Sequence, residues 1–170
     1  MINVVLYSPE IPQNTGNISR TCAVTGARLH IIKPIGFEIS DRTLKRAGLD
    51  YWDKLDVTYY DSYEDFLAKN EGAKAYYFTA HATASYADVH YPEDVYLVFG
   101  RESVGLPQEL VEANADRALR IPMRGEVRCL NLSNAVAVAV YEVLRQRNFE
   151  GLCEEGTPRT FAWGDATNGK

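Results

Sequence analysis

Short apolar runs rich in β-branched and aromatic residues alternate with stretches of helical periodicity along most of the chain. Parallel strands need crossover connections, so this alternation predicts an α/β fold in which helices flank a mostly parallel sheet. We expect strands at Asn3 to Tyr7, Leu29 to Ile32, Val57 to Tyr60, Ala75 to Thr79, Val95 to Phe99 and Ala118 to Ile121. We expect helices at Asn14 to Thr25, Ser40 to Ala47, Ser62 to Lys69, Gln108 to Asn114 and Leu132 to Arg147.

The last of these helices is the most apolar, and its valines and alanines cover more than one helical face. We therefore expect it to be buried on two sides, one against the sheet and the other against a second subunit. Beyond Gly151 the apolar periodicity ends, and short polar stretches containing glycine follow. The 170 residues thus predict one domain over residues 1–151 and a tail over residues 152–170.

The composition is that of a globular protein, with 46% hydrophobic and 24% charged residues. No apolar run approaches the roughly 18 residues of a membrane span, and the first residues lack the features of a signal peptide. The three cysteines and three histidines show no metal-ligand spacing, and the cysteines are too far apart to indicate a disulfide framework. We expect a cytoplasmic protein without a metal.

The formal net charge of −5 argues against a partner bound by bulk electrostatics, such as long duplex DNA. A local basic patch is still able to bind a nucleic acid, because binding depends on where the charges lie. Scattered surface bases are the alternative explanation. The candidate patch residues are Arg20 with Arg28, then Arg42, Lys45 and Arg46, then Arg124 and Arg128.

Three polar loops that contain glycine, residues 9–20, 100–107 and 121–134, each follow a predicted strand. Ligands bind at the carboxyl ends of the strands in an open parallel sheet, so these loops are expected to converge. In the first loop Asn14 is a plausible N-cap, and Gly16 permits close approach of another backbone. Arg20 lies one turn beyond Gly16 and can reach a ligand there, although this loop taken alone favours a capped helix with an ordinary surface arginine.

The other two loops also combine a structural and a functional explanation. Gly100 leaves room for a flat ligand at a strand end, and Glu102 offers a carboxylate to a basic partner or a ribose hydroxyl. A strand-to-helix turn with a structural salt bridge is the alternative. In the third loop Asn131 is a plausible N-cap, and the helix that starts at Leu132 or Ser133 can bind a polar ligand with its first amides.

Three common signatures are missing from the chain. It has no G-x-G-x-x-G after a strand, no Walker loop and no G-x-S-x-G elbow. Their absence argues against an ordinary NAD-type Rossmann enzyme, an ATPase and an α/β-hydrolase.

Taken together and in order, the three loops resemble the motifs of the SPOUT superfamily of RNA methyltransferases. The resemblance is strongest to the TrmL (YibK-like) branch, whose members methylate the ribose 2'-hydroxyl of the wobble cytidine or uridine in tRNA. It implies the SPOUT fold with a C-terminal trefoil knot, and a homodimer. The matching stretches are Pro9 to Arg20, Arg46 to Tyr51, Phe99 to Pro107, Ile121 to Met123 and Asn131 to Val136.

The same resemblance implies S-adenosyl-L-methionine as the methyl donor and the anticodon stem-loop of tRNA as the partner. Arg20 would orient a phosphate and stabilise the developing alkoxide, because a guanidinium is a poor proton acceptor at neutral pH. Glu102 would hold Arg20, and Asn14, Ser133 and Asn134 would fix the ribose. The implied cofactor residues are Phe78, Thr79, Gly100, Ile121, Cys129 and Leu130, and the implied phosphate contacts are Arg20, Arg42, Lys45 and Arg46.

Two alternatives stay open at this point. A sister SPOUT enzyme would methylate another tRNA position or ribosomal RNA, although no additional RNA-binding domain precedes Met1 in the sequence. A noncatalytic module would bind the cofactor or RNA without transferring a methyl group, since a fold does not fix a function.

Overall fold

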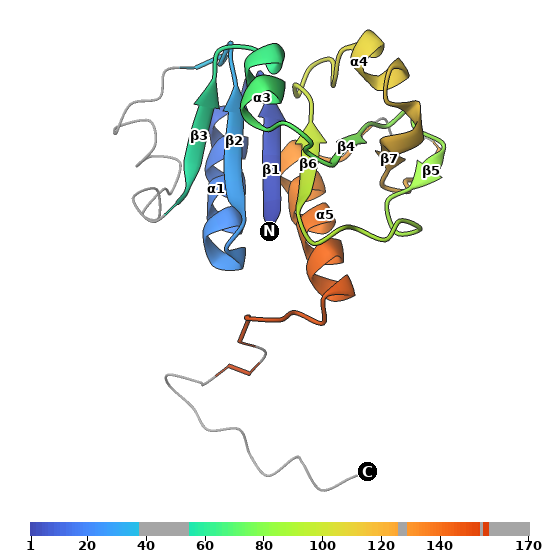
Figure 1. Cartoon of the computed structure of the whole chain (residues 1–170). Helices are drawn as coiled ribbons and strands as arrows, with labels where there is room; N and C mark the ends of the chain where they lie inside the picture. Colours follow the sequence, from blue (N-terminus) through green and yellow to red (C-terminus); the bar gives the residue numbers. More distant parts are fainter. Residues whose placement is uncertain (38–54, 126–128, 154, 157–170) are drawn as a thin grey trace, which may run out of the picture.

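The structure is a computed structural model that describes residues 1–37, 55–125, 129–153 and 155–156. Its sheet has the strand order β3-β2-β1-β6-β4-β7-β5, and all pairs of these strands are parallel (Figure 1). The predicted α/β architecture is therefore confirmed. The strands are β1 (Ile2–Tyr7), β2 (Arg28–Ile32), β3 (Val57–Tyr60), β4 (Ala75–Phe78), β5 (Ala84–Ser85), β6 (Val95–Phe99) and β7 (Ala118–Arg120).

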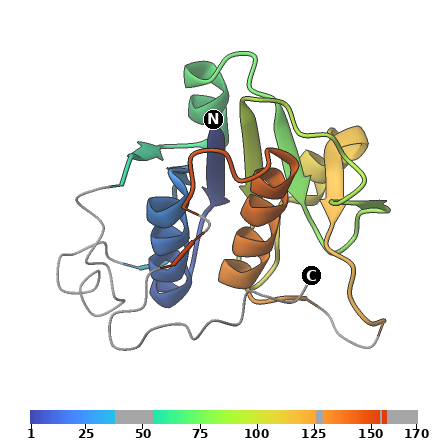
Figure 2. The same cartoon turned by 90° about the horizontal axis from the view of Figure 1, so that it is seen from below.

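Helices cover both faces of the sheet. The long helices α1 (Pro12–Thr25) and α5 (Leu132–Gln146) lie side by side on one face, and α3 (Tyr63–Lys69) lies on the other (Figure 2). The short helix α4 (Gln108–Glu112) packs on the α3 side through Leu110 and Val111, and a 3₁₀ turn, Ala115–Arg117, leads into β7. The helix expected at Ser40 to Ala47 lies outside the described residues. In the part that the structure describes, no helix has the length and apolar character of a membrane span.

The larger hydrophobic core lies between the sheet and the α1–α5 layer. Fully buried side chains from β1 and β6 meet Ile18 and Cys22 of α1 and Val136, Val140 and Val143 of α5. Burying each such side chain contributes about 1.5–3 kcal/mol, so this layer fixes the two helices on the sheet. Leu152 is half-buried and packs against the same core.

The side of α5 that the sequence assigned to a second subunit is open to solvent in the single chain. Asn134, Val138, Tyr141 and Arg145 recur at helical spacing along it, and all four are exposed. Val138 and Tyr141 are 37% and 47% exposed, which is unusual for large apolar side chains on so apolar a helix.

A buried polar network lies on the other side of the sheet, and we call it the His30 network. The two ring nitrogens of His30 hydrogen-bond to the hydroxyl of Tyr60 at 2.8 Å and to the side-chain oxygen of Asn3 at 3.2 Å. Asn70 donates to the Tyr60 hydroxyl at 3.1 Å and accepts from the Tyr96 hydroxyl at 3.2 Å. Burial lowers the pKa of His30 to about 4, so the ring is neutral at physiological pH.

The helix starts confirm the cap predicted at Asn131 and correct the one predicted at Asn14. Ser62 accepts from the backbone amide of Asp65, and Asn131 accepts from the backbone amide of Ser133, as N-caps do. The prediction for α1 was wrong, because Ile11 occupies the N-cap position and the helix begins at Pro12. Proline suits this first position since its fixed φ is already helical. Asn14 instead lies buried inside the first turn.

Candidate functional site

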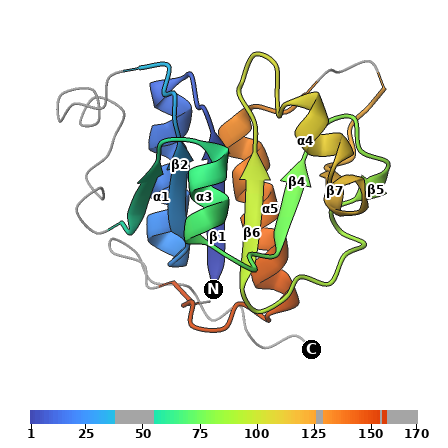
Figure 3. The same cartoon turned by 45° about the horizontal axis from the view of Figure 1, so that its top comes forward.

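The sheet order brings the three loops to one edge. The carboxyl ends of β1, β6, β4 and β7 are adjacent, because these strands are neighbours and run in the same direction. Thr79 and Gly100 follow directly after β4 and β6, and Ile121 follows β7. Seen with this edge turned forward, the loop after β6 and the start of α5 lie beside the start of α1 (Figure 3). The predicted convergence is confirmed.

Glu102 in the loop after β6 caps α1 from outside the helix. Its carboxylate accepts from the backbone amides of Glu10 at 2.9 Å and Ile11 at 3.2 Å. It also accepts from the side-chain amide of Asn14 at 3.0 Å. A negative charge at a helix N-terminus is favourable, so this contact supplies the cap that Ile11 cannot. The structure therefore gives Glu102 a role at the start of α1, and its contact with Arg20 stays a prediction.

A chain of side-chain hydrogen bonds joins all three loops. Asn131 donates its amide to the side-chain oxygen of Asn14 at 3.0 Å, and Asn14 donates onward to Glu102. The hydroxyl of Ser133 donates to the side-chain oxygen of Asn131 at 2.7 Å. Because an ionised carboxylate only accepts, Glu102 fixes the orientation of both amides and hence the direction of the whole chain. We call these four residues the loop chain.

A second carboxylate also joins the first two loops, but here the first loop supplies the carboxylate and the second loop supplies the donors. Glu10 accepts from the backbone amide of Ser103 and from its hydroxyl, both at 3.0 Å. These hydrogen bonds lower the pKa of Glu10, with a smaller contribution from the charge of Arg101. Glu10 and Ser103 are not among the residues predicted from the sequence to act at the site. The one available signal was that Glu10 is the only ionisable side chain between Pro9 and Asn14.

The loop after β6 has a tightly defined backbone. Arg101 and Gly105 exchange backbone hydrogen bonds of 3.1 and 2.9 Å, and Gly105 has a φ of +75° that favours glycine. A Cβ added at Gly100 would lie 2.1 Å from the backbone of Gly105 and Leu106. The space beside Gly100, which the sequence analysis reserved for a ligand, is therefore filled by its own loop. Glycine is required here for packing of the backbone.

Of the residues expected to bind a cofactor, four lie at the carboxyl ends of β4, β6 and β7: Phe78, Thr79, Gly100 and Ile121. Phe78 is buried and stacks on Phe99 with ring centroids 4.7 Å apart, so its ring belongs to the core. Thr79 and Ile121 are half-buried, whereas Leu130 is 40% exposed. Leu130 and Ile121 thus each leave part of an apolar side chain open to solvent. Cys129 is also exposed.

The residues expected to bind the substrate differ in exposure, and the structure does not describe all of them. Arg20 lies on α1 one turn beyond Gly16 and is exposed, as is Asn134 on α5. Ser133 is buried and belongs to the loop chain. Arg42, Lys45, Arg46 and Arg128 lie outside the described residues. Arg28 forms an ion pair of 2.8 Å with Asp56, which explains that base structurally.

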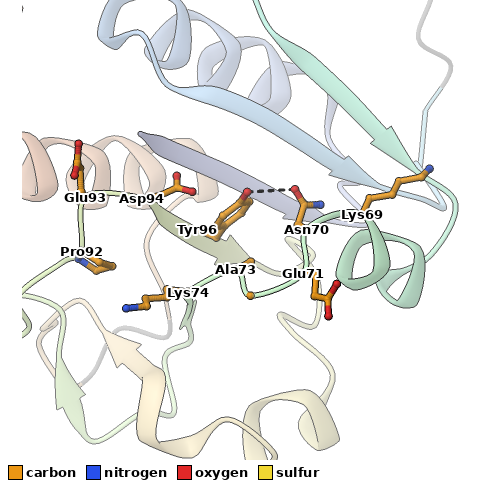
Figure 4. A pocket seen from close by; sticks show the side chains of 10 residues that line it. Lys69, Asn70, Glu71, Ala73, Lys74, Pro92, Glu93, Asp94 and Tyr96 are labelled. Carbon is orange, nitrogen blue, oxygen red and sulfur yellow. Dashed lines mark hydrogen bonds between the residues drawn. The ribbon is translucent and has the colours of Figure 1, made fainter.

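A hollow of about 450 Å³ lies elsewhere, at the amino ends of β4 and β6 (Figure 4). Its lining is polar and of mixed charge, including Lys74, Glu93 and Asp94 beside the hydrogen-bonded pair Asn70 and Tyr96. None of the side chains predicted to act in chemistry lines it. We place the candidate site at the opposite edge, because ligands of parallel sheets bind at carboxyl ends and the three loops meet there.

The family model for the SpoU rRNA Methylase family matches residues 1–141. The Escherichia coli (strain K12) protein named tRNA (cytidine(34)-2'-O)-methyltransferase is 47% identical over 152 residues, covering 89% of this chain and 97% of that protein. A solved structure described as "Structural insights into the 2-OH methylation of C/U34 on tRNA" is 49% identical with a TM-score of 0.82. That match covers 88% of this chain and 97% of the solved one.

A more distant structure carries information about a cofactor. The AdoMet-bound rRNA methyltransferase of Sinorhizobium meliloti is 26% identical, with a TM-score of 0.75 over 85% of this chain and 56% of that one.

Proposed function

The chain belongs to the SpoU rRNA methylase family, and we propose that it transfers a methyl group to the ribose 2'-hydroxyl of the wobble nucleotide of tRNA. The observation that carries this conclusion is the loop chain, which brings side chains of all three family motifs together at the carboxyl edge. The tRNA substrate follows from relatives that match over nearly their whole length.

S-adenosyl-L-methionine is the proposed methyl donor, and when bound it supplies an electrophilic methyl group. The side chains at this edge fit such a molecule. Leu130 and Ile121 offer apolar surface for an adenine ring. The half-buried Thr79 follows β4, which lies in the sheet between β6, followed by Gly100, and β7, followed by Ile121. The AdoMet-bound relative supports this assignment.

Arg20 is proposed to hold the acceptor nucleotide. An alcohol is a weak nucleophile, so the site has to orient the hydroxyl and stabilise the negative charge that develops on its oxygen. The guanidinium of Arg20 is exposed on α1, on the helix whose first turn is bound by Glu102. A guanidinium presents several fixed donors to a phosphate or an alkoxide.

The loop chain is proposed to position the acceptor rather than to remove its proton. Both polar atoms of the Asn14 side chain are hydrogen-bonded within the protein: the amide nitrogen donates to Glu102, and the oxygen accepts from Asn131. Ser133 uses its proton toward Asn131, which leaves its oxygen able to accept from a ribose hydroxyl. Asn134 is exposed one residue further along α5 and is proposed to contact the same sugar.

A homodimer and a C-terminal knot complete the proposal. The α1–α5 layer exposes Val24, Val138 and Tyr141 on one side, and a second copy of the chain would cover them. After β7, near one end of the sheet order, the chain returns past β4 and β6 to place α5 against α1 and β1. Such a long return is what a knotted carboxyl-terminal segment requires. Arg42, Lys45 and Arg46 are proposed to contact tRNA phosphates.

The test is a direct assay with position mapping. Purified chain, labelled S-adenosyl-L-methionine and unmodified tRNA are incubated, and the tRNA is then digested and sequenced by mass. We expect label only on the ribose of position 34 in tRNA. Label on a base, at another position or in ribosomal RNA alone would contradict the proposal, as would cofactor binding without any transfer.

A further inference from the structure

The loops after β1 and β6 are joined by two carboxylates that point in opposite directions. Glu102 accepts the backbone amides of Glu10 and Ile11, while Glu10 accepts the backbone amide and the hydroxyl of Ser103. Each loop thus supplies one carboxylate and receives the other. We call this arrangement the reciprocal clamp.

The backbone of Glu10 is also held from a third side. The amide of Gly36 donates to the carbonyl of Pro9 at 2.9 Å, and a Cβ at Gly36 would lie 2.9 Å from the Cα of Glu10. Glu10 therefore lies half-buried between the segment after β2 and the tip of the loop after β6. A side chain so placed governs how the two motif loops sit relative to each other.

We propose that Glu10 is a positioning residue for methyl transfer, which fixes the loop that begins at Gly100 against the helix that carries Arg20. This inference rests on the proposed function, because it assigns the two sides of the clamp to the donor and the acceptor. Gly100 lies on the side proposed for the methyl donor, and Arg20 on the side proposed for the acceptor ribose.

The energetics of the reaction make this contact important even though it lies near the surface. In-line displacement requires the nucleophile and the methyl group to be aligned closely, and an error of about 1 Å can cost about 100-fold in rate. Surface hydrogen bonds contribute little to overall stability, since water replaces them at small cost. Loss of the clamp is therefore expected to reduce the rate far more than the stability.

The clamp also argues against a role for Glu10 as a general base. Its pKa is lowered by two hydrogen bonds from Ser103, and a carboxylate stabilised in this way is a weak proton acceptor. Both of its oxygens already accept a donor from the neighbouring loop. Its contribution is to geometry.

The experiment compares Glu10→Ala, Glu10→Gln and Ser103→Ala with the wild-type chain in the position-mapped tRNA assay. We expect Glu10→Ala to lower kcat by about tenfold or more, with the Kd for S-adenosyl-L-methionine within about twofold of wild type. Glu10→Gln retains an acceptor of the same length, so it should restore kcat to within about threefold of wild type. Ser103→Ala removes one of two bonds and should fall between them.

A matched control separates positioning from general stability. Asp65 on α3 accepts a backbone amide from Asp61 at 3.1 Å and a lysine at 2.9 Å, on the other face of the sheet. Asp65→Ala should match Glu10→Ala in Tm and leave kcat unchanged. The double variant Glu10→Ala with Ser103→Ala should be no slower than Glu10→Ala, since both remove the same contact.

Four results would overturn the positioning role of Glu10. A Glu10→Ala kcat within twofold of wild type would overturn the inference, as would a loss that Glu10→Gln does not restore, because that result indicates a requirement for charge. A loss explained by weaker cofactor binding would also overturn it. A wild-type chain that methylates no tRNA would overturn the proposed function, and with it this inference.

Discussion

The loop chain and the His30 network are built from the same kinds of side chain but lie in different surroundings. Both join residues far apart in sequence through amides, hydroxyls and either a carboxylate or an imidazole. The His30 network is largely enclosed, with Asn3, His30 and Tyr60 all buried. The loop chain lies at the edge and is partly open to solvent, because Asn131 is exposed and Glu102 half-buried, whereas Asn14 and Ser133 are buried.

This difference separates stability from activity. A buried polar group that loses its partner costs its full desolvation energy, about 1–3 kcal/mol, because water cannot replace the partner. The same loss at an exposed edge costs less, but it displaces groups whose alignment controls a reaction. We therefore expect changes in the His30 network to lower stability with little effect on catalysis, and changes at the loop edge to do the reverse.

The largest effect is expected at Arg20. Arg20→Ala should lower methyl transfer by about 100- to 1,000-fold, because a group that stabilises developing charge is lost, while the Kd for S-adenosyl-L-methionine stays unchanged. Single-turnover rates and calorimetry measure the two quantities. Arg28→Ala is the matched control, since it removes an exposed arginine that is paired with Asp56 away from the loops. Equal losses in both variants would indicate a general effect of charge on RNA binding.

Gly100→Ala should lower both stability and activity. Its Cβ would lie 2.1 Å from the backbone of the loop, so that loop has to move. We expect a loss of about 1–3 kcal/mol in the free energy of unfolding, together with weaker cofactor binding. Gly125→Ala provides the control, since its Cβ would meet nothing within 4 Å. A stable and active Gly100→Ala variant would show that the loop is not constrained.

The fold was predictable because its signal is local and repeated. The six predicted strand runs, such as Val57 to Tyr60 and Val95 to Phe99, are short and largely apolar, and the structure has a strand at each of them. Strand β5 was missed because two residues, Ala84 and Ser85, carry no periodicity. The start of α1 was placed two residues too late, since its cap comes from Glu102, 91 positions beyond Ile11.

The convergence of the three loops was predictable, but the contacts between their side chains were not. The three loops could be expected at one edge because parallel strands share a carboxyl end. Which side chains contact one another depends on loop conformations that the sequence does not encode in any regular pattern. The bond from Asn131 to Asn14 spans 117 positions, and the clamp between Glu10 and Ser103 spans 93. Gly100 was read as space for a ligand, whereas the structure fills that space with backbone.

His30→Leu should lower stability without lowering activity. It leaves the buried oxygen of Asn3 without its partner, so the free energy of unfolding should fall by about 1–3 kcal/mol while kcat stays at the wild-type value. Urea unfolding and the methylation assay measure the two effects on the same preparation. A loss of activity beyond the unfolded fraction would contradict the proposed separation.

The same histidine predicts how stability depends on pH. Its pKa is about 4 in the folded chain against 6.5 ordinarily, because burial disfavours the charged ring. Between these values the unfolded chain binds a proton that the folded chain does not, so stability is lost as the pH falls. We expect wild type to lose about 2 kcal/mol between about pH 7.5 and pH 5 from this group, and His30→Leu to lack that part of the slope. Equal slopes would contradict the assignment.

Asn131→Asp is expected to have the smallest effect on methyl transfer among the changes at the loops. Aspartate keeps the N-cap of α5, but it leaves the buried side-chain oxygen of Asn14 without its donor, so the free energy of unfolding should fall by about 1 kcal/mol. It loses the amide that donates to Asn14, which should slow methyl transfer severalfold. Asn114→Asp is the control, because it loses a comparable amide donor to the carbonyl of Leu110 away from the loops. A variant as active as wild type would remove Asn131 from the site.

The location of the site is tested most directly by amide hydrogen exchange with and without S-adenosyl-L-homocysteine, the product that remains after methyl transfer. We predict added protection in residues 100–106, 118–125 and 129–133, in the loops after β6 and β7, and none in residues 69–74 and 92–96 around the hollow at the opposite edge. Protection confined to that hollow, or no protection in the loops after β6 and β7, would contradict the account.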